Sequence, residues 1–203
     1  MGSLSHFDVR GLTERYGCTL FAETGTGTGE GLATALAAGV LDPCCSVEIN
    51  ERLWQQARTR FSGDQRAALL LGPSTEGIKD ILHVFGKAKI LWWLDAHFPG
   101  ADYGLAAYDA EPRDAVRMPL REELELIKGR PGGGAGDVIL IDDARLFLTV
   151  GGWGAGNLDG KYRTLVPPSL TGSYWIRDLF SDTHTLSIDY TDQGYIALLP
   201  RGV

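Results

Sequence analysis

The stretch that decides the fold is LFAETGTGTGE, residues 20–30. An apolar run, Leu20 to Ala22, ends on the acidic residue Glu23, and glycines follow at positions 25, 27 and 29. A helix-forming run, residues 32–38, comes next. This succession of strand, glycine-rich turn and helix is typical of the first crossover of an open α/β sheet, where backbone N–H groups face a ligand.

The glycine spacing excludes two common ligand-binding loops. A dinucleotide fingerprint requires G-x-G-x-x-G, but Glu30 and Leu32 occupy the closing positions. A phosphate-binding P-loop requires Gly-Lys-Ser/Thr, which this stretch lacks. A Gly/Thr-rich surface turn without a ligand is the alternative, and the apolar segments on both sides of the loop argue against it.

Outward from this stretch, apolar strands alternate with amphipathic helices. We predict parallel strands over residues 18–23, 44–49, 67–72, 90–95 and 138–142, with a hairpin over 185–189 and 195–199. The unbroken apolar run in 67–72 is typical of a strand covered on both faces. The pattern predicts an α/β fold, a doubly wound parallel sheet with an antiparallel edge, in a single domain of residues 1–203. Its ligand crevice is expected at the carboxyl ends of the first and fourth strands.

Composition limits the partners and the compartment. The net charge is −7, from 19 basic and 26 acidic residues, which argues against non-specific nucleic-acid binding and against docking on an anionic membrane. The cysteines at 18, 44 and 45 fit no metal spacing and no disulfide framework. With no targeting segment and no long apolar run, we expect a cytoplasmic protein.

The pattern E-x-G-x-G-x-G over residues 23–29 resembles motif I of the class I S-adenosylmethionine-dependent methyltransferases. Glu48 resembles the acidic residue of the family's motif II, and a carboxylate at a strand end can accept hydrogen bonds from both ribose hydroxyls. The resemblance spans roughly residues 20–150 and implies a Rossmann-like, seven-stranded sheet of order 3-2-1-4-5-7-6 with helices on both faces. It also implies that S-adenosylmethionine is bound by Glu23, Thr24, Gly25, Thr26, Gly27, Gly29, Glu48, Ile49, Ser74 and Asp95.

One segment departs from the family's pattern. After the third strand the family commonly has Gly-Asp-Ser or Gly-Asp-Ala, whose aspartate reaches the adenine amine. This chain has Gly72-Pro73-Ser74. Proline offers neither a carboxylate nor an N–H group. Adenine recognition must therefore rest on Ser74, on the backbone or on apolar contacts.

Carboxylates end the fourth and fifth strands. Asp95 follows an apolar strand, and Asp142 and Asp143 follow another. Neighbouring strands lie about 4.8 Å apart, so the three side chains converge and repel unless a cation or a shared proton compensates. An all-oxygen set suits Mg²⁺, Mn²⁺ or Ca²⁺. The arrangement resembles the metal site of catechol-type and macrocin-type O-methyltransferases, which implies Asp95, Asp142 and Asp143 as ligands.

His97 lies two residues after Asp95 and could act as a general base or as a further ligand. We expect Asp95 and His97 to be the catalytic pair. In the plainer alternative, Asp142 and Asp143 cap the following segment and His97 is a hydrogen-bonding loop residue. Five aromatic residues are expected in segments that flank the crevice: Phe98, Tyr103, Tyr108, Trp153 and Tyr162. These segments either close over an acceptor as lids or are plain solvent-exposed loops.

These features together predict a methyltransferase that acts on an oxygen of a small molecule or glycan, with a divalent cation left open. A metal-dependent hydrolase or hydroxylase using Asp95, His97 and Asp142 is the first alternative. A non-catalytic nucleoside-binding module is the second. We expect no nucleic-acid or membrane partner, and the sequence leaves a homodimer open.

Overall fold

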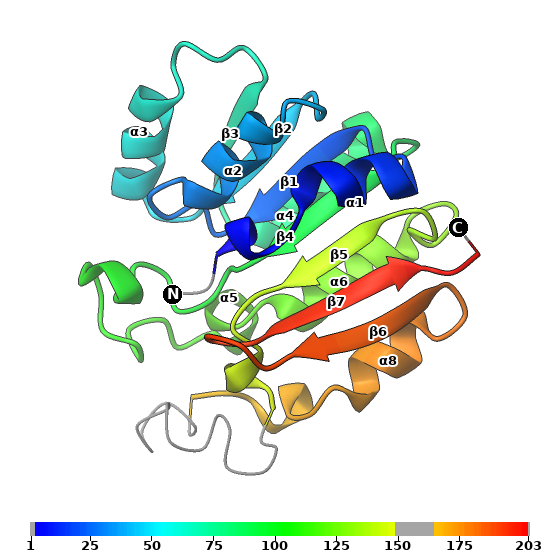
Figure 1. Cartoon of the computed structure of the whole chain (residues 1–203). Coiled ribbons are helices and arrows are strands. Elements are labelled where there is room, and N and C mark those ends of the chain that lie inside the picture. Colours follow the sequence, from blue (N-terminus) through cyan, green and yellow to red (C-terminus); the bar gives the residue numbers. More distant parts are fainter. Residues whose placement is uncertain (1–2, 149–164, 203) are drawn as a thin grey trace.

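A computed structural model describes residues 3–148 and 165–202 of the chain (Figure 1). Its centre is a seven-stranded sheet of order β3-β2-β1-β4-β5-β7-β6. The strands are β1 (Leu20–Thr24), β2 (Cys44–Glu48), β3 (Ala67–Leu71), β4 (Ile90–Leu94), β5 (Val138–Ile141), β6 (His184–Asp189) and β7 (Tyr195–Pro200). The predicted strand order is therefore confirmed.

The direction of the strands follows from their connections. The five strands from β3 to β5 pair in parallel, because a helix or a long loop returns the chain between them. Strand β7 runs antiparallel to both β5 and β6, as the predicted hairpin requires. The carboxyl ends of the parallel strands consequently meet at one edge of the sheet.

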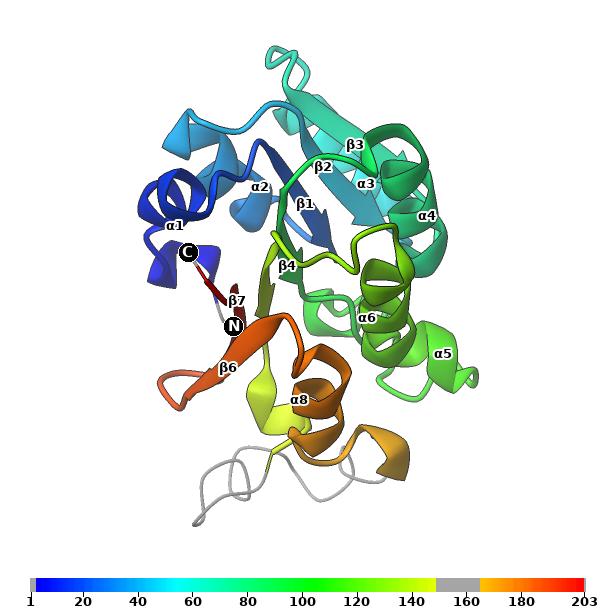
Figure 2. The same ribbon diagram turned by 90° about the vertical axis from the view of Figure 1, so that its right-hand side faces the viewer.

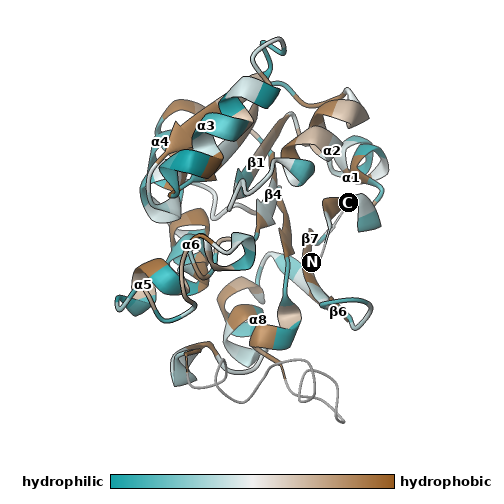
Figure 3. Ribbon diagram, turned by 90° about the vertical axis from the view of Figure 1, so that its left-hand side faces the viewer, coloured by the Kyte–Doolittle hydropathy of each residue, from teal (hydrophilic) through white to brown (hydrophobic). Residues whose placement is uncertain are grey.

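Helices cover the two faces of the sheet and enclose two hydrophobic cores. The α-helices are α1 (Val9–Tyr16), α2 (Glu30–Ala38), α3 (Glu51–Arg60), α4 (Ser74–Phe85), α5 (Asp114–Arg117), α6 (Leu120–Gly129) and α8 (Tyr174–Phe180). Helices α4, α6 and α8 lie on one side of the sheet, and α1 and α2 lie on the other (Figure 2). Helix α3 carries hydrophilic and hydrophobic residues along different sides, as expected of a helix that packs with one face (Figure 3).

Side chains that alternate along β4 contribute to both hydrophobic cores. Trp92 faces the core under α4 and α6, and Trp93 faces the core under α1 and α2. Their exposed fractions are 0% and 3%, so both are core residues and not a substrate platform. Because successive side chains of a strand point to opposite faces, one apolar run serves two layers of helices.

Two sequence-based expectations need correction. Strand β3 is only half-buried, and Leu71 is 46% exposed, because β3 is an edge strand with one neighbour. The segment from Phe98 to Met118, whose Gly, Pro and Tyr content predicts a loop, contains the 3₁₀ helix η2 (Ala101–Tyr103) and α5. Trp153 and Tyr162 lie outside the described residues.

Within the described residues, the structure contains no helix that is both long enough and apolar enough to cross a lipid bilayer.

Candidate functional site

The glycine loop between β1 and α2 adopts a backbone conformation that glycine tolerates best. Gly25, Gly27 and Gly29 have φ angles of 81°, 52° and 85°. A Cβ atom added to Gly25 would lie 2.7 Å from the carbonyl oxygen of Asp95. The loop therefore packs directly on the carboxyl end of β4, and no side chain fits between them.

Glu23 is buried behind this loop. Its exposed fraction is 1%, and its Oε1 atom accepts a hydrogen bond of 2.6 Å from the Ser46 hydroxyl. A Cβ atom on Gly31 would lie only 2.2 Å from Glu23 Oε2, so the first turn of α2 sits on the carboxyl group. Burial raises the pKa of Glu23 to about 8, against the hydrogen bonds from Ser46 and Leu32. This residue holds the loop and α2 together.

The side chain of Glu48, at the end of β2, binds the backbone of the glycine loop. Its Oε2 atom accepts a hydrogen bond of 2.9 Å from the Gly27 N–H group, and its Oε1 atom accepts one of 2.8 Å from Asn50. Burial raises the pKa of Glu48, while these backbone donors lower it. The carboxyl group is thus fixed at the end of β2, next to the glycine loop.

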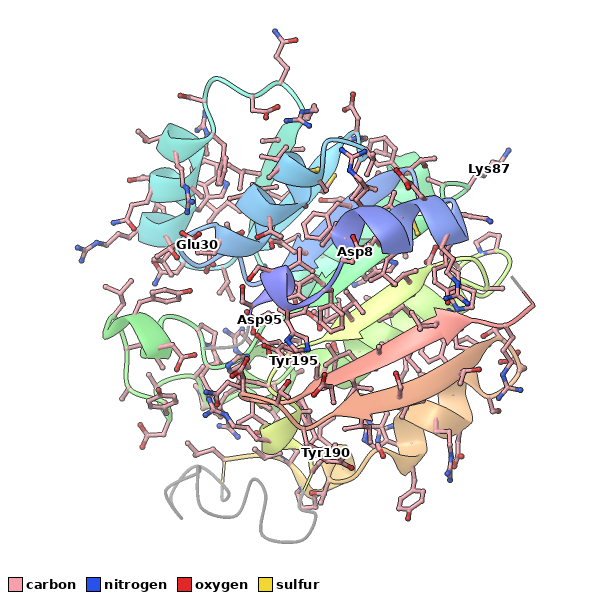
Figure 4. All side chains as sticks on the ribbon, in the orientation of Figure 1. Asp8, Glu30, Lys87, Asp95, Tyr190 and Tyr195 are labelled. Atoms are coloured by element: carbon pink, nitrogen blue, oxygen red, sulfur yellow. The ribbon has the colours of Figure 1, made fainter. Side chains whose placement is uncertain are left out.

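A pocket runs along the carboxyl ends of β4, β1, β2 and β3. This edge of a parallel sheet is where open α/β proteins bind their ligands. Among the predicted donor-binding residues, the pocket is lined by Gly25, Gly27, Glu48, Ile49, Ser74 and Asp95. Figure 4 labels Asp95 at the edge of the sheet where the parallel strands end.

Four other residues predicted to bind the donor do not line this pocket. Glu23 is beneath α2, and the Thr26 hydroxyl hydrogen-bonds the Ser46 hydroxyl at 2.5 Å. Gly29 faces the ring of Phe61, which a Cβ atom would approach to 2.6 Å. Thr24 is fully buried. These residues support the loop from behind, because only part of a tight turn can face a ligand.

A segment after β4, residues 98–104, crosses the glycine loop, and we name it the post-β4 strap. A Cβ atom on Gly27 would lie 1.8 Å from the Tyr103 hydroxyl, and one on Gly100 would lie 3.1 Å from Asn50 Nδ2. The strap therefore reaches from β4 over β1 to the end of β2. Tyr103 and Phe98 both line the pocket, and Phe98, which is 3% exposed, also belongs to the hydrophobic core.

His97 stands among three carboxyl groups. Its Nε2 atom lies 2.9 Å from Asp143 Oδ2 and 3.4 Å from Asp102 Oδ2, and its Nδ1 atom lies 3.5 Å from Asp95 Oδ1. Arg145 Nε lies 3.0 Å from Asp143 Oδ1. Asp102 is not among the residues predicted from the sequence, because a carboxylate inside a loop gives no strand-end signal.

The charges of this cluster follow from burial and proximity. Burial lowers the pKa of His97, but Asp102, Asp143 and Asp95 together raise it well above its ordinary value. Burial raises the pKa of Asp95 well above its usual range, and repulsion from Asp142 and Asp143 adds to this rise. The pKa of Asp143 is lowered by His97 and Arg145 despite its burial. His97 and Asp143 therefore form a charged pair, and the neighbouring Asp95 carboxylate is a stronger base than an ordinary aspartate.

The structure brings two of the three predicted metal ligands together with His97. Asp95, His97 and Asp143 each offer one ligand atom, and these atoms lie within 4.8 Å of one another. Asp142 is not a member of this group, and its Oδ1 atom accepts a hydrogen bond of 2.7 Å from the Asp143 N–H group. The left-handed backbone of Asp143, with φ of 52°, turns the chain here, so the second aspartate and not the first joins His97.

Comparisons with known proteins place this geometry in a fold family. The sequence matches no family model, and no curated protein matches it. Among solved structures, the chain is similar to a Staphylococcus aureus protein assigned as a caffeoyl-CoA O-methyltransferase, with 12% identity and a TM-score of 0.62. The match covers 98% of this chain and 84% of that chain.

Two further matches carry a bound ligand in the neighbouring protein. The Podospora anserina methyltransferase PaMTH1, bound to SAH, is 16% identical, with a TM-score of 0.60 and coverage of 96% of this chain and 76% of its own. An O-methyltransferase of Bacillus cereus in complex with SAH is 16% identical, with a TM-score of 0.50 and coverage of 95% and 79%. The chain has the fold of class I S-adenosylmethionine-dependent methyltransferases.

Proposed function

We propose that this protein transfers a methyl group from S-adenosylmethionine to an oxygen atom of a small molecule or glycan. The observation that carries the proposal is the pocket along the carboxyl ends of β4, β1 and β2, with Glu48 and Asp95 in its wall. Glu48 offers a carboxylate for the two ribose hydroxyls, and Asp95 stands where the acceptor must approach. When bound, the donor supplies a methyl group on a positively charged sulfur.

Asp95 and His97 have different roles in this proposal. Asp95 takes up the proton that the acceptor hydroxyl releases as its oxygen forms a bond to the methyl carbon and the carbon–sulfur bond breaks. The raised pKa makes the ionised Asp95 carboxylate a stronger base than an ordinary aspartate. His97 is held by Asp143 and Asp102 and orients the cluster around Asp95.

The same cluster fits a divalent cation. The ligand atoms of Asp95, His97 and Asp143 lie within 4.8 Å of one another. Burial, and after it repulsion from Asp142 and Asp143, raises the pKa of Asp95, and a cation would relieve that repulsion. His97 would bind the cation as the neutral imidazole and would release its proton. Two carboxylate oxygens and one imidazole nitrogen suit Mn²⁺ or Fe²⁺, and such a cation would lower the pKa of an acceptor hydroxyl.

Calorimetric titration with S-adenosylhomocysteine tests the proposal. We expect binding to the wild-type chain and at least tenfold weaker binding to Glu48→Ala, because a charged acceptor of two hydrogen bonds is lost. Glu51→Ala, an exposed change three residues away, is the control and keeps the wild-type affinity. No heat of binding with a folded wild-type protein would refute the proposal.

The Asp95–His97–Asp143 group also keeps a metal-dependent hydrolase as a second candidate. That function needs the metal and not the sulfur-containing donor. A protein that binds Mn²⁺ but neither S-adenosylmethionine nor S-adenosylhomocysteine would favour the hydrolase over the methyltransferase.

A further inference from the structure

The post-β4 strap belongs to a short loop that is held at both ends. Phe98, its first residue, is buried in the hydrophobic core, and its N–H group donates a hydrogen bond of 2.9 Å to the carbonyl oxygen of Arg117. At the other end, the ring of Tyr108 packs edge-to-face on the ring of Phe98, with 5.3 Å between the ring centroids. These aromatic contacts fix where the loop leaves the core and where it returns.

Two glycines divide this loop. Gly100 and Gly104 have left-handed backbones, with φ angles of 74° and 67°, and they enclose the single turn η2. A Cβ atom on Gly104 would meet no atom of the described residues within 4 Å beyond its own chain neighbours, so packing does not require a glycine there. Glycine adopts either sign of φ at little cost. The two positions can therefore serve as hinges about which η2 turns as a unit.

Two adjacent residues of η2 contact different parts of the pocket. Tyr103 contacts the glycine loop, since a Cβ atom on Gly27 would lie 1.8 Å from its hydroxyl oxygen and 2.6 Å from its Cζ atom. Asp102 Oδ2 lies 3.4 Å from His97 Nε2. Because the two residues share one turn, a rotation of η2 that lifts Tyr103 off the glycine loop also separates Asp102 from His97.

A hydroxyl group from the far end of the loop holds this turn in place. Tyr108 donates a hydrogen bond of 2.7 Å to Asp102 Oδ1, while His97 faces the other oxygen of the same carboxylate. Hydrogen bonds to an ionised acceptor are stronger than those between neutral groups. Tyr108 does not line the pocket, whereas Asp102 and Tyr103 do. Its hydroxyl group therefore acts on the strap from outside the pocket.

We propose that the strap is a gate over the glycine loop, and that Asp102, held by Tyr108 and facing His97, is the latch of this gate. The donor enters and leaves while η2 is turned away from the glycine loop, and the structure has the gate closed. This inference rests on the proposed function and adds a conformational step to it. The step couples the two parts of the pocket, because the Asp102 carboxylate joins His97 only when the gate is closed.

Stopped-flow binding of S-adenosylhomocysteine tests the gate. If the ligand passes only through the open form, the rate constants of association and dissociation both scale with the fraction of molecules that are open. Tyr108→Phe removes the hydrogen bond to the latch and should raise both rate constants about fivefold. The dissociation constant should change by less than about twofold, because the two rate constants rise together.

Tyr174→Phe is the matched control for this experiment. It removes the same hydroxyl group from a side chain that is 70% exposed at the start of α8. Both rate constants should equal those of the wild-type protein. A merely structural role of Tyr108 would lower the free energy of unfolding and leave the association rate constant unchanged.

The outcomes distinguish the two proposals. If the wild-type chain does not bind S-adenosylhomocysteine, the methyltransferase proposal fails and the gate fails with it. If the wild-type chain binds it, but Tyr108→Phe leaves the association rate constant unchanged, only the gate is overturned. Faster dissociation alone, with weaker binding, would also overturn the gate, since it would mean that the strap contributes a ligand contact.

Thermal unfolding confirms that each variant is folded. Asp102→Asn keeps the size of the latch and removes its charge, which weakens its contact with His97. This variant should also raise both rate constants, and it decides the matter should Tyr108→Phe not fold.

Discussion

Single buried residues carry much of the chemistry at the edge of this sheet. Glu23 is a carboxyl group with 1% exposure, held by Ser46 and by the first turn of α2. Its pKa rises from 4.5 to about 8 on folding, mainly because burial disfavours the charged form. The folded protein therefore keeps a proton that the unfolded chain releases at lower pH.

This proton makes stability depend on pH. Between about pH 4.5 and pH 8 the folded state binds more protons at Glu23 than the unfolded state, so the free energy of unfolding falls as pH rises through this window. Glu23→Gln should reduce this slope by up to about 1.4 kcal/mol per pH unit. Urea unfolding measured from pH 5 to pH 8 checks the expectation.

The exposed Glu14→Gln is the control for this experiment, and its slope should match that of the wild-type protein. An unchanged slope in Glu23→Gln would contradict the assigned protonation.

At the scale of elements, a buried carboxylate just before β5 connects β4, β5 and the end of α6. Asp137 is 0% exposed and accepts hydrogen bonds from Ile90 N–H at 2.9 Å and from Trp92 Nε1 at 3.0 Å. Arg130 Nη2 donates to the same carboxyl group at 2.7 Å. Asp137 thus fixes the start of β4 against the start of β5, and with it the register that places Asp95.

Asp137→Ala should lower the free energy of unfolding by about 3–5 kcal/mol, because it leaves a buried arginine and two buried donors unpaired. Denaturant unfolding provides the measurement. Asp182→Ala removes an exposed partner of Lys128 and should change stability by less than about 1 kcal/mol. If the two substitutions lowered the free energy of unfolding equally, the buried hydrogen bonds of Asp137 would contribute no more to stability than an exposed ion pair.

At the scale of the whole molecule, elements distant in sequence bring the acidic cluster together. Asp95 follows β4, Asp102 lies in η2, and Asp143 follows β5. The parallel sheet aligns the ends of β4 and β5, and the post-β4 strap returns Asp102 toward His97. A ligand that binds this cluster stabilises the folded state as a whole.

Mn²⁺ should therefore raise the melting temperature of the wild-type protein. At 100-fold excess over the dissociation constant the gain is about 2.7 kcal/mol, and roughly 2–4 °C accompany each kcal/mol in a chain of this size. Asp143→Asn should abolish the shift, and Asp142→Asn should retain at least half of it. Differential scanning calorimetry with and without Mn²⁺ provides the measurement. The reverse pattern would show that Asp142, and not Asp143, binds the cation.

The sequence alone determined the alternation of strands and helices and the edge of the sheet where the pocket lies. It did so because apolar runs of strand length alternate with amphipathic helices, and because Gly25, Gly27 and Glu48 follow those runs directly. The resemblance to motifs I and II supplied the strand order, which the structure confirms.

Only the tertiary structure decided which side chains face the pocket and which surround His97. The carboxylate of Asp143, whose backbone is left-handed, lies 2.9 Å from His97 Nε2, and the strap places Tyr103 against Gly27. Glu123 is buried where α6 packs on α4. A residue's direction at the end of a strand depends on local φ and ψ and on contacts across the chain, and neither can be read from the periodicity of the sequence.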